Sequence, residues 1–139
     1  NSPRMAYLPF IDRMAEQANR ALVVCRNDMT GEDTHMPRDI YLEHIASSRF
    51  TLILPAYVSS CFSVYRLIES LEHDCLPIIH EDCHTEEVGK SFGVDLSPLV
   101  RDTYPKERTR VELLDYYRSK ILVMDKDFQI SGSHDEYRA

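Results

Sequence analysis

Three short apolar runs constrain the fold of this chain more than any other feature of its sequence. They occupy residues 21–25, 50–54 and 75–79. Short runs that stay apolar at nearly every position are typical of strands covered on both faces, as the strands of a parallel sheet are. Proline follows the second run at position 55 and lies near the start of the third at position 77, which are places where a strand tolerates it. The runs therefore predict three buried strands.

Each of the three runs is preceded by a segment with the spacing of a helix. Residues 8–20, 37–47 and 61–73 repeat apolar side chains every three to four positions. The resulting order alternates helix and strand, which favours right-handed crossovers and a parallel sheet. The sequence thus predicts an α/β fold class with a mainly parallel sheet and helices on both faces.

The remaining segments carry weaker signals. Residues 26–36 and 56–60 are predicted to be loops, and a charged helix is predicted over residues 107–120. Between them, Gly89, Gly93 and Pro98 are expected to break regular structure. Residues 131–139 form a polar tail that is expected to fray. With no internal repeat, the 139 residues are predicted to form a single domain.

Composition excludes several classes of protein. The formal charge of -7 argues against general binding to nucleic acid, because an acidic surface repels phosphate backbones. No transmembrane segment is predicted, since no run approaches the ~20 apolar residues that a spanning helix needs. The four glycines, at positions 31, 89, 93 and 132, allow neither a dinucleotide-binding fingerprint nor a P-loop.

The chain context predicts a soluble cytoplasmic domain. Four cysteines are too sparse for a disulfide framework, so reduced thiols are expected. The first residues contain no apolar run of signal-peptide length. If the chain is a piece of a longer polypeptide, a Golgi-lumen or membrane-associated context stays open.

The helix after the second run has the chemistry of an anion site. Ligands of parallel sheets bind where loops leave the carboxyl ends of strands, and a helix that follows presents unpaired N–H groups. Ser59 or Ser60 can cap this helix, and Arg66 can neutralise a phosphate. Its polar positions share one arc that is expected to be free to bind, opposite an apolar side: Ser63, Arg66, Glu69, Ser70 and His73 against Val64, Leu67, Ile68 and Leu71.

The spacing within this helix fits a nucleotide. Glu69 lies nine residues beyond Ser60, which is about 13 Å along a helix and comparable with the span from a diphosphate to a ribose. The carboxylate could accept protons from ribose hydroxyls. The alternative is a solvated face on which Arg66 and Glu69 form a weak ion pair of ~0.2–0.5 kcal/mol.

The same residues resemble a known family. The segments Ser48-Arg49-Phe50-Thr51-Leu52-Ile53-Leu54-Pro55, Arg66-Leu67-Ile68-Glu69-Ser70-Leu71 and Asp74-Cys75-Leu76-Pro77-Ile78-Ile79 are similar to the donor-binding half of exostosin-like and related GT-B glycosyltransferases. That family carries roughly S-K-F-C-L-x-P, S-x-R-x-x-E-A-L and G-C-x-P-V-I. The resemblance covers residues 41–82. This chain departs from the pattern at Ser63, which lies three residues before Arg66 instead of two, and at Ser70 and Asp74 in place of alanine and glycine.

The resemblance implies a Rossmann-like three-layer domain that holds a nucleoside diphosphate sugar. The donor-binding residues it implies are Ser59, Ser60, Ser63, Arg66 and Glu69. In addition, Tyr57 is expected to stack on a base or sugar and Asp82 to bind hydroxyls. The acceptor site, and commonly the catalytic base, belong to an N-terminal half, so a longer chain or a partner chain is expected to complete the enzyme. No cofactor or metal is expected, because helix N–H groups and Arg66 can stabilise a pyrophosphate leaving group.

Three other interpretations were weighed. The segment 80–84, His-Glu-Asp-Cys-His, has zinc donors without C-x-x-C or H-E-x-x-H spacing, so a polar loop is favoured. Cys61 at a helix start could be a nucleophile, but no spacing identifies its base, and packing is favoured. Arg26-Asn27-Asp28, Gly31, Ser48-Arg49, Ser60-Cys61 and Tyr65 also resemble TIR-type signalling domains, some of which cleave NAD, although that fold needs a strand before Leu8.

Overall fold

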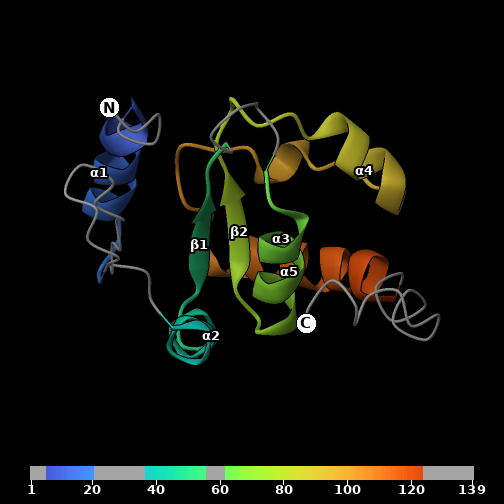
Figure 1. Cartoon of the computed structure of the whole chain (residues 1–139), viewed down its shortest axis with the longest axis horizontal. Helices are drawn as coiled ribbons and strands as arrows, with labels where there is room; N and C mark the ends of the chain where they lie inside the picture. The colour runs from blue at the N-terminus through green and yellow to red at the C-terminus, as the bar shows by residue number, and fades with distance from the viewer. Residues whose placement is uncertain (1–5, 21–36, 56–61, 124–139) are drawn as a thin grey trace.

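The computed structural model describes residues 6–20, 37–55 and 62–123 (Figure 1). The predicted strand at 21–25, the loops at 26–36 and 56–60, and the polar tail at 131–139 lie outside the described residues. In the described part the protein is a mixed α/β structure with five α-helices and a two-stranded parallel sheet.

The bounds of the described elements are α1 Leu8–Gln17, α2 Arg38–Ala46, β1 Phe50–Ile53, α3 Val64–Glu72, β2 Leu76–Ile79, α4 Glu86–Phe92, the 3-10 turn η2 Ser97–Leu99, α5 Glu107–Tyr117 and the π-helical turn η3 Arg118–Leu122. From α2 to β2 the described elements alternate between helix and strand as predicted.

The two strands confirm the second and third apolar runs as parallel partners. Phe50 lies opposite Leu76 and Ile53 opposite Ile79, and α3 forms the crossover between the strands. All four residues of β2 are buried, as expected for a strand with uniformly apolar side chains. Val100 adds an isolated parallel bridge to Ile79.

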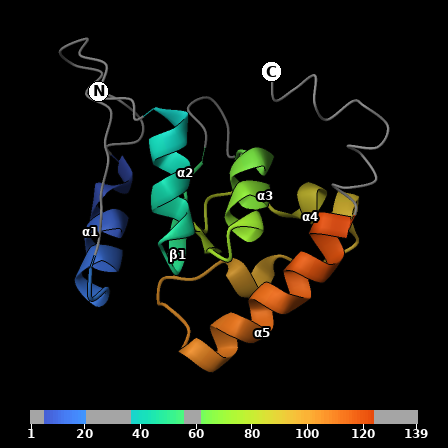
Figure 2. The same cartoon turned by 90° about the horizontal axis from the view of Figure 1, so that it is seen from below.

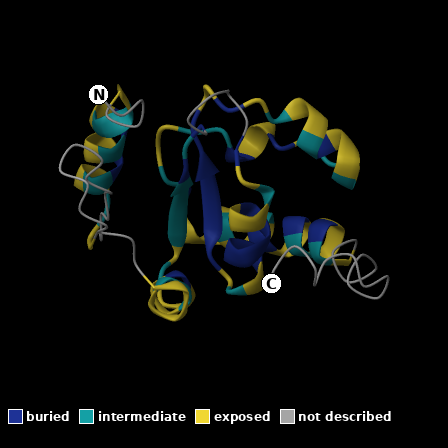
Figure 3. Cartoon of the chain, viewed as in Figure 1, coloured by how far each residue is buried: buried dark blue, intermediate teal, exposed yellow. Residues whose placement is uncertain are grey.

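The helices enclose the core from several sides. α3 lies against one face of the strands and α5 crosses the opposite face (Figures 1 and 2). The buried side chains gather between these layers, as the dark segments of β2, α3 and α5 show (Figure 3). The core cluster consists of Phe10, Met14, Ile53, Phe62, Leu67, Ile68, Leu71, Leu76, Ile78, Ile79, Cys83, Leu96, Leu99, Leu114, Tyr117 and Ile121.

Two cysteines lie in the described residues. Cys75 and Cys83 are buried free thiols, as the sequence predicts, whereas Cys25 and Cys61 lie outside that part. No helix among the described residues combines the length and apolar character that crossing a bilayer requires.

Helix boundaries differ from the sequence prediction in places. α1 ends at Gln17 instead of residue 20, and α3 begins at Val64 instead of residue 61. Gly89 was expected to break regular structure but lies inside α4, where a Cβ would stand 2.6 Å from the Val94 carbonyl oxygen. Glycine is therefore required at 89 by a close backbone approach. The left-handed Gly93, with φ 67°, ends α4 as predicted.

The end of α3 is shaped by a left-handed aspartate. Asp74 has φ 58°, its N–H donates to the Leu71 carbonyl, and the Cys75 N–H donates to the Ser70 carbonyl. These two bonds form the Schellman motif that usually carries glycine at this position. The Asp74 side chain also pairs with Arg118 near the protein surface.

Replacing Asp74 with alanine is expected to lower the free energy of unfolding by about 1 kcal/mol, because alanine gives no local hydrogen bond to offset the left-handed backbone. Asp74→Gly is expected to match or exceed the wild type, since the exposed ion pair to Arg118 contributes little. Urea unfolding of both variants measures the difference. Asp115→Ala, at an exposed position within α5, is the matched control. Equal stability of the alanine and glycine variants at 74 would contradict the backbone argument.

Candidate functional site

The N-terminus of α3 lies at the carboxyl edge of the sheet, because α3 runs back from the end of β1 to the start of β2 (Figure 1). Ser63 is the N-cap residue, is exposed, and makes no side-chain capping hydrogen bond. Its hydroxyl is therefore not used by the helix. Tyr57, Ser59 and Ser60 were also predicted to bind the donor, and they lie outside the described residues.

Arg66 brings positive charge to the first turn of α3. It is the third helical residue, one turn earlier than the sequence suggested, and its side chain is exposed. The first turn holds no acidic residue, although helix N-termini favour acidic side chains and disfavour cations. Arg66 lies over the ring of Tyr41 in α2, with 5.8 Å between its guanidinium carbon and the ring centroid. The helix terminus and Arg66 thus make one electropositive end.

Glu69 is buried, which corrects the expectation of a polar face free to bind. Only 7% of its side chain is exposed, and the adjacent Ser70 is fully buried, with its hydroxyl donating to the Leu67 carbonyl at 2.8 Å. The pattern of polar residues could not reveal this, because α2 packs beside α3 and covers part of its polar arc. Glu69 lies six residues beyond the N-cap Ser63, or about 9 Å along the helix.

The Glu69 carboxylate pairs with a residue that sequence reasoning missed. Nη2 of Arg38, the first residue of α2, lies 2.7 Å from Glu69 Oε2. The same Oε2 is buried and accepts no hydrogen bond of proper geometry. The contact with Arg38 is therefore an ion pair without a hydrogen bond. Attraction between charges needs no alignment, so the two groups still form an ion pair at this distance. The carboxylate keeps unused acceptor capacity.

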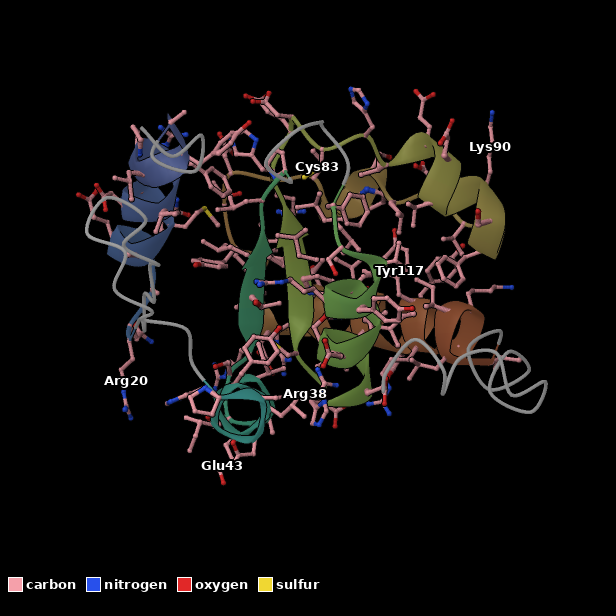
Figure 4. The ribbon with its side chains drawn as sticks, in the orientation of Figure 1. Arg20, Arg38, Glu43, Cys83, Lys90 and Tyr117 are labelled. Atoms are coloured by element: carbon pink, nitrogen blue, oxygen red, sulfur yellow. The ribbon has the colours of Figure 1, made fainter. Side chains whose placement is uncertain are left out.

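Tyr41 lies among these charged side chains. Its pKa is raised, mainly by burial, while Arg66 lowers the pKa and Glu69 raises it. Arg38 also lowers this pKa, so all three charged groups act on the phenol. The four side chains form one cluster across α2 and α3, which we call the α2–α3 charge cluster: Arg38, Tyr41, Arg66 and Glu69. Figure 4 shows the side chains between the two helices, with Arg38 labelled.

Asp82 lies beyond the carboxyl end of β2 and is exposed. Its Oδ2 accepts a hydrogen bond from the Tyr7 hydroxyl at 3.2 Å, and its backbone N–H donates to His80 Nδ1 at 3.0 Å. The rings of Tyr7 and Phe10 meet His80 edge-on, with centroids 4.7 and 4.6 Å away. Sequence reasoning missed both aromatic residues, because no local pattern links α1 to the end of β2.

The donors of the segment 80–84 do not converge on a metal. His80 is buried between the aromatic rings, and the Cys83 thiol points to the Ile53 carbonyl at 3.8 Å. Among the residues that the structure describes, no group of three or more His, Cys, Asp or Glu side chains could hold a metal ion.

Comparisons with protein-family models, with curated proteins and with solved structures find no match to this chain. Any assignment of function therefore depends on the residues of the site.

Proposed function

We propose that this chain is the nucleotide-sugar donor-binding domain of a glycosyltransferase, of the Rossmann-like, three-layer, exostosin-like GT-B kind. The observation that carries the proposal is the charge arrangement along α3. An arginine stands in a first turn that holds no acidic residue, and a buried glutamate follows one turn later. This arrangement suits a ligand with an anionic end and a hydroxyl-bearing end.

The anionic end would be a diphosphate. Backbone N–H groups at a helix N-terminus attract phosphate, and the free hydroxyl of Ser63 and the guanidinium of Arg66 add donors. A cation in the first turn is unfavourable for the helix alone, so a bound anion would remove that conflict. During transfer, the same groups would stabilise the charge that develops on a departing nucleoside diphosphate.

The hydroxyl-bearing end would be the ribose. Burying a carboxylate costs free energy, and a buried ion pair is weak evidence of a stabilising role. We therefore assign Glu69 a binding role, in which its carboxylate accepts hydrogen bonds from ribose hydroxyls. Asp82, at the carboxyl end of the neighbouring strand, would bind hydroxyls of the sugar after releasing Tyr7.

Sugar transfer itself needs an acceptor site and a catalytic base, for which we assign no residue in this chain. We propose that an N-terminal acceptor-binding half, in a longer polypeptide or a partner chain, supplies both. The chain alone is then expected to bind donor without transferring sugar.

The proposal is tested by the melting temperature of the chain with UDP, GDP or NAD. A ligand that binds the folded state at a hundredfold excess over Kd adds about 2.7 kcal/mol, so one of the two diphosphates is expected to raise the melting temperature by several degrees. Arg66→Ala and Glu69→Ala are each expected to weaken binding by about tenfold or more, because each removes a charged hydrogen-bonding partner.

Arg108→Ala is the matched control for Arg66→Ala. Arg108 is an exposed arginine of α5 that pairs with Glu112, and its loss should leave ligand binding unchanged. Absence of a shift with both diphosphates, or an undiminished shift in Arg66→Ala, would overturn the proposal. A shift with NAD alone would favour a TIR-like module instead.

A further inference from the structure

The ion pair between Arg38 and Glu69 joins an exposed side chain to a buried one. The Arg38 side chain is 60% exposed, whereas that of Glu69 is 7% exposed. The glutamate is held inside the helix packing, and the arginine reaches it from the solvent side. Losing Arg38 would therefore leave a buried carboxylate without its counter-charge, whereas losing Glu69 would only free a solvated arginine.

The contact with Arg38 engages one named oxygen of the Glu69 carboxylate, Oε2. Two carboxylate oxygens offer about four lone-pair positions, and the 2.7 Å contact of Arg38 Nη2 is with Oε2. A guanidinium that holds one oxygen restricts rotation of the whole carboxylate and so fixes the direction in which the other oxygen faces. Such restriction is what a site needs in order to direct a hydrogen bond toward a ligand.

α2 contacts two charged residues of α3 in this way. Arg38 meets Glu69, and Tyr41, less than one turn further along α2, underlies Arg66. The face of α2 therefore supports the two groups that, under the proposed function, would bind the ribose and the diphosphate. Nothing in the periodicity of residues 37–47 distinguishes Arg38 from an ordinary exposed residue.

We infer that Arg38 is a positioning residue which holds the Glu69 carboxylate for ribose hydroxyls, so that the site selects nucleotides that carry those hydroxyls. This inference rests on the proposed function. Arg38 acts on the ligand through Glu69, so its loss should matter only for ligands that Glu69 can contact.

The test compares UDP with 2′,3′-dideoxy-UDP, and GDP with its dideoxy analogue, by calorimetric titration. The wild type is expected to prefer the hydroxyl-bearing nucleotide by about tenfold or more, because a polar site rejects a ligand that lacks its hydrogen-bonding partner. In Arg38→Gln the preference is expected to fall to about twofold or less, through weaker binding of UDP or GDP and unchanged binding of the dideoxy nucleotide.

The controls separate positioning from a general structural role. Arg108→Gln makes the same chemical change on α5 and should keep the wild-type preference. Glu69→Gln should lose the preference whether or not Arg38 is present, so Arg38→Gln in the Glu69→Gln background should have no further effect on it. If Arg38→Gln does not fold, Arg38→Lys decides, since it keeps the charge without the planar guanidinium and should give an intermediate preference.

The outcomes distinguish this inference from the proposed function. Failure of both UDP and GDP to bind the wild type would refute the proposed function and the inference with it. Binding with an unchanged hydroxyl preference in Arg38→Gln would refute the inference alone. Tighter binding of UDP or GDP by Arg38→Gln would also refute it, because Arg38 would then compete with the ribose for Glu69.

Discussion

Raising the pH from about 8 to about 11 is expected to lower the free energy of unfolding by about 3 kcal/mol through Cys75 alone. Burial raises the pKa of the Cys75 thiol from 9.0 to about 12, with a smaller opposing effect of Arg110. Above pH 9 the unfolded chain loses this proton while the folded chain keeps it. The unfolded state then binds fewer protons, so stability falls as the pH rises until the folded thiol also ionises near pH 12.

Two further buried groups add to the same loss. Burial, with help from Asp82, raises the pKa of Cys83 from 9.0 to about 11, and burial raises that of Tyr117 from 10.0 to about 12. The pKa values of both groups are raised, as that of Cys75 is. The loss of stability with rising pH should therefore steepen above pH 10. Tyr117 starts from an ordinary pKa of 10.0 and the thiols from 9.0, so the loss through Tyr117 should begin at a higher pH.

Urea unfolding at a series of pH values from about 8 to about 11 measures this loss. Cys75→Ala is expected to be less stable than the wild type near neutral pH and to lose stability less steeply above pH 9, by about 1.4 kcal/mol per pH unit. If the free energy of unfolding fell equally with pH in the two proteins, burial would not raise the pKa of the Cys75 thiol.

Ile78→Ala is expected to lower the free energy of unfolding by about 2–5 kcal/mol. Ile78 is fully buried in β2, the strand whose residues are buried at every position between α3 and α5. Removing its branched side chain loses apolar burial and leaves a cavity that two packed layers cannot readily close. Chemical unfolding followed by circular dichroism measures the change.

Ile40→Ala is the matched control for this core substitution. Ile40 lies in α2 with 38% of its surface exposed, so its truncation should change stability by less than about 1 kcal/mol. If the two variants lost similar stability, the center of the core would not lie at β2.

The sequence could predict the strands because their signal is local. Phe50–Ile53 and Leu76–Ile79 each consist of consecutive residues that are mostly apolar, with Pro55 shortly after the first strand and Pro77 at the second residue of the other. The helices between them follow from periodicity in the same way. Helix ends were less certain: α3 begins three residues later than expected, at Val64. Apolar residues can keep a helical spacing for a few positions beyond the end of a helix, so the spacing does not mark where the helix ends.

The candidate site could be predicted only in part, because its details depend on packing. The order of Ser63, Arg66 and Glu69 is visible in the sequence, but the burial of Glu69 depends on α2, which contacts α3 through tertiary structure. Arg38 carries no local mark of its role. Gly89 was misinterpreted for a similar reason: a glycine forced by a nearby carbonyl has the same appearance in a sequence as one that ends a helix.

The docking of α1 has a consequence for synthesis of the chain. The Tyr7 hydroxyl bonds to Asp82, which lies 75 residues later, and the Gln17 side chain bonds to the Asp102 carbonyl, 85 residues later. Most of the domain must therefore be synthesised before the apolar side of α1, with Phe10 and Met14, can pack against the core. Until then these apolar side chains stay exposed, where chaperones can bind them. Docking of α1 closes the long loop between its two ends, so it should be the last step of folding.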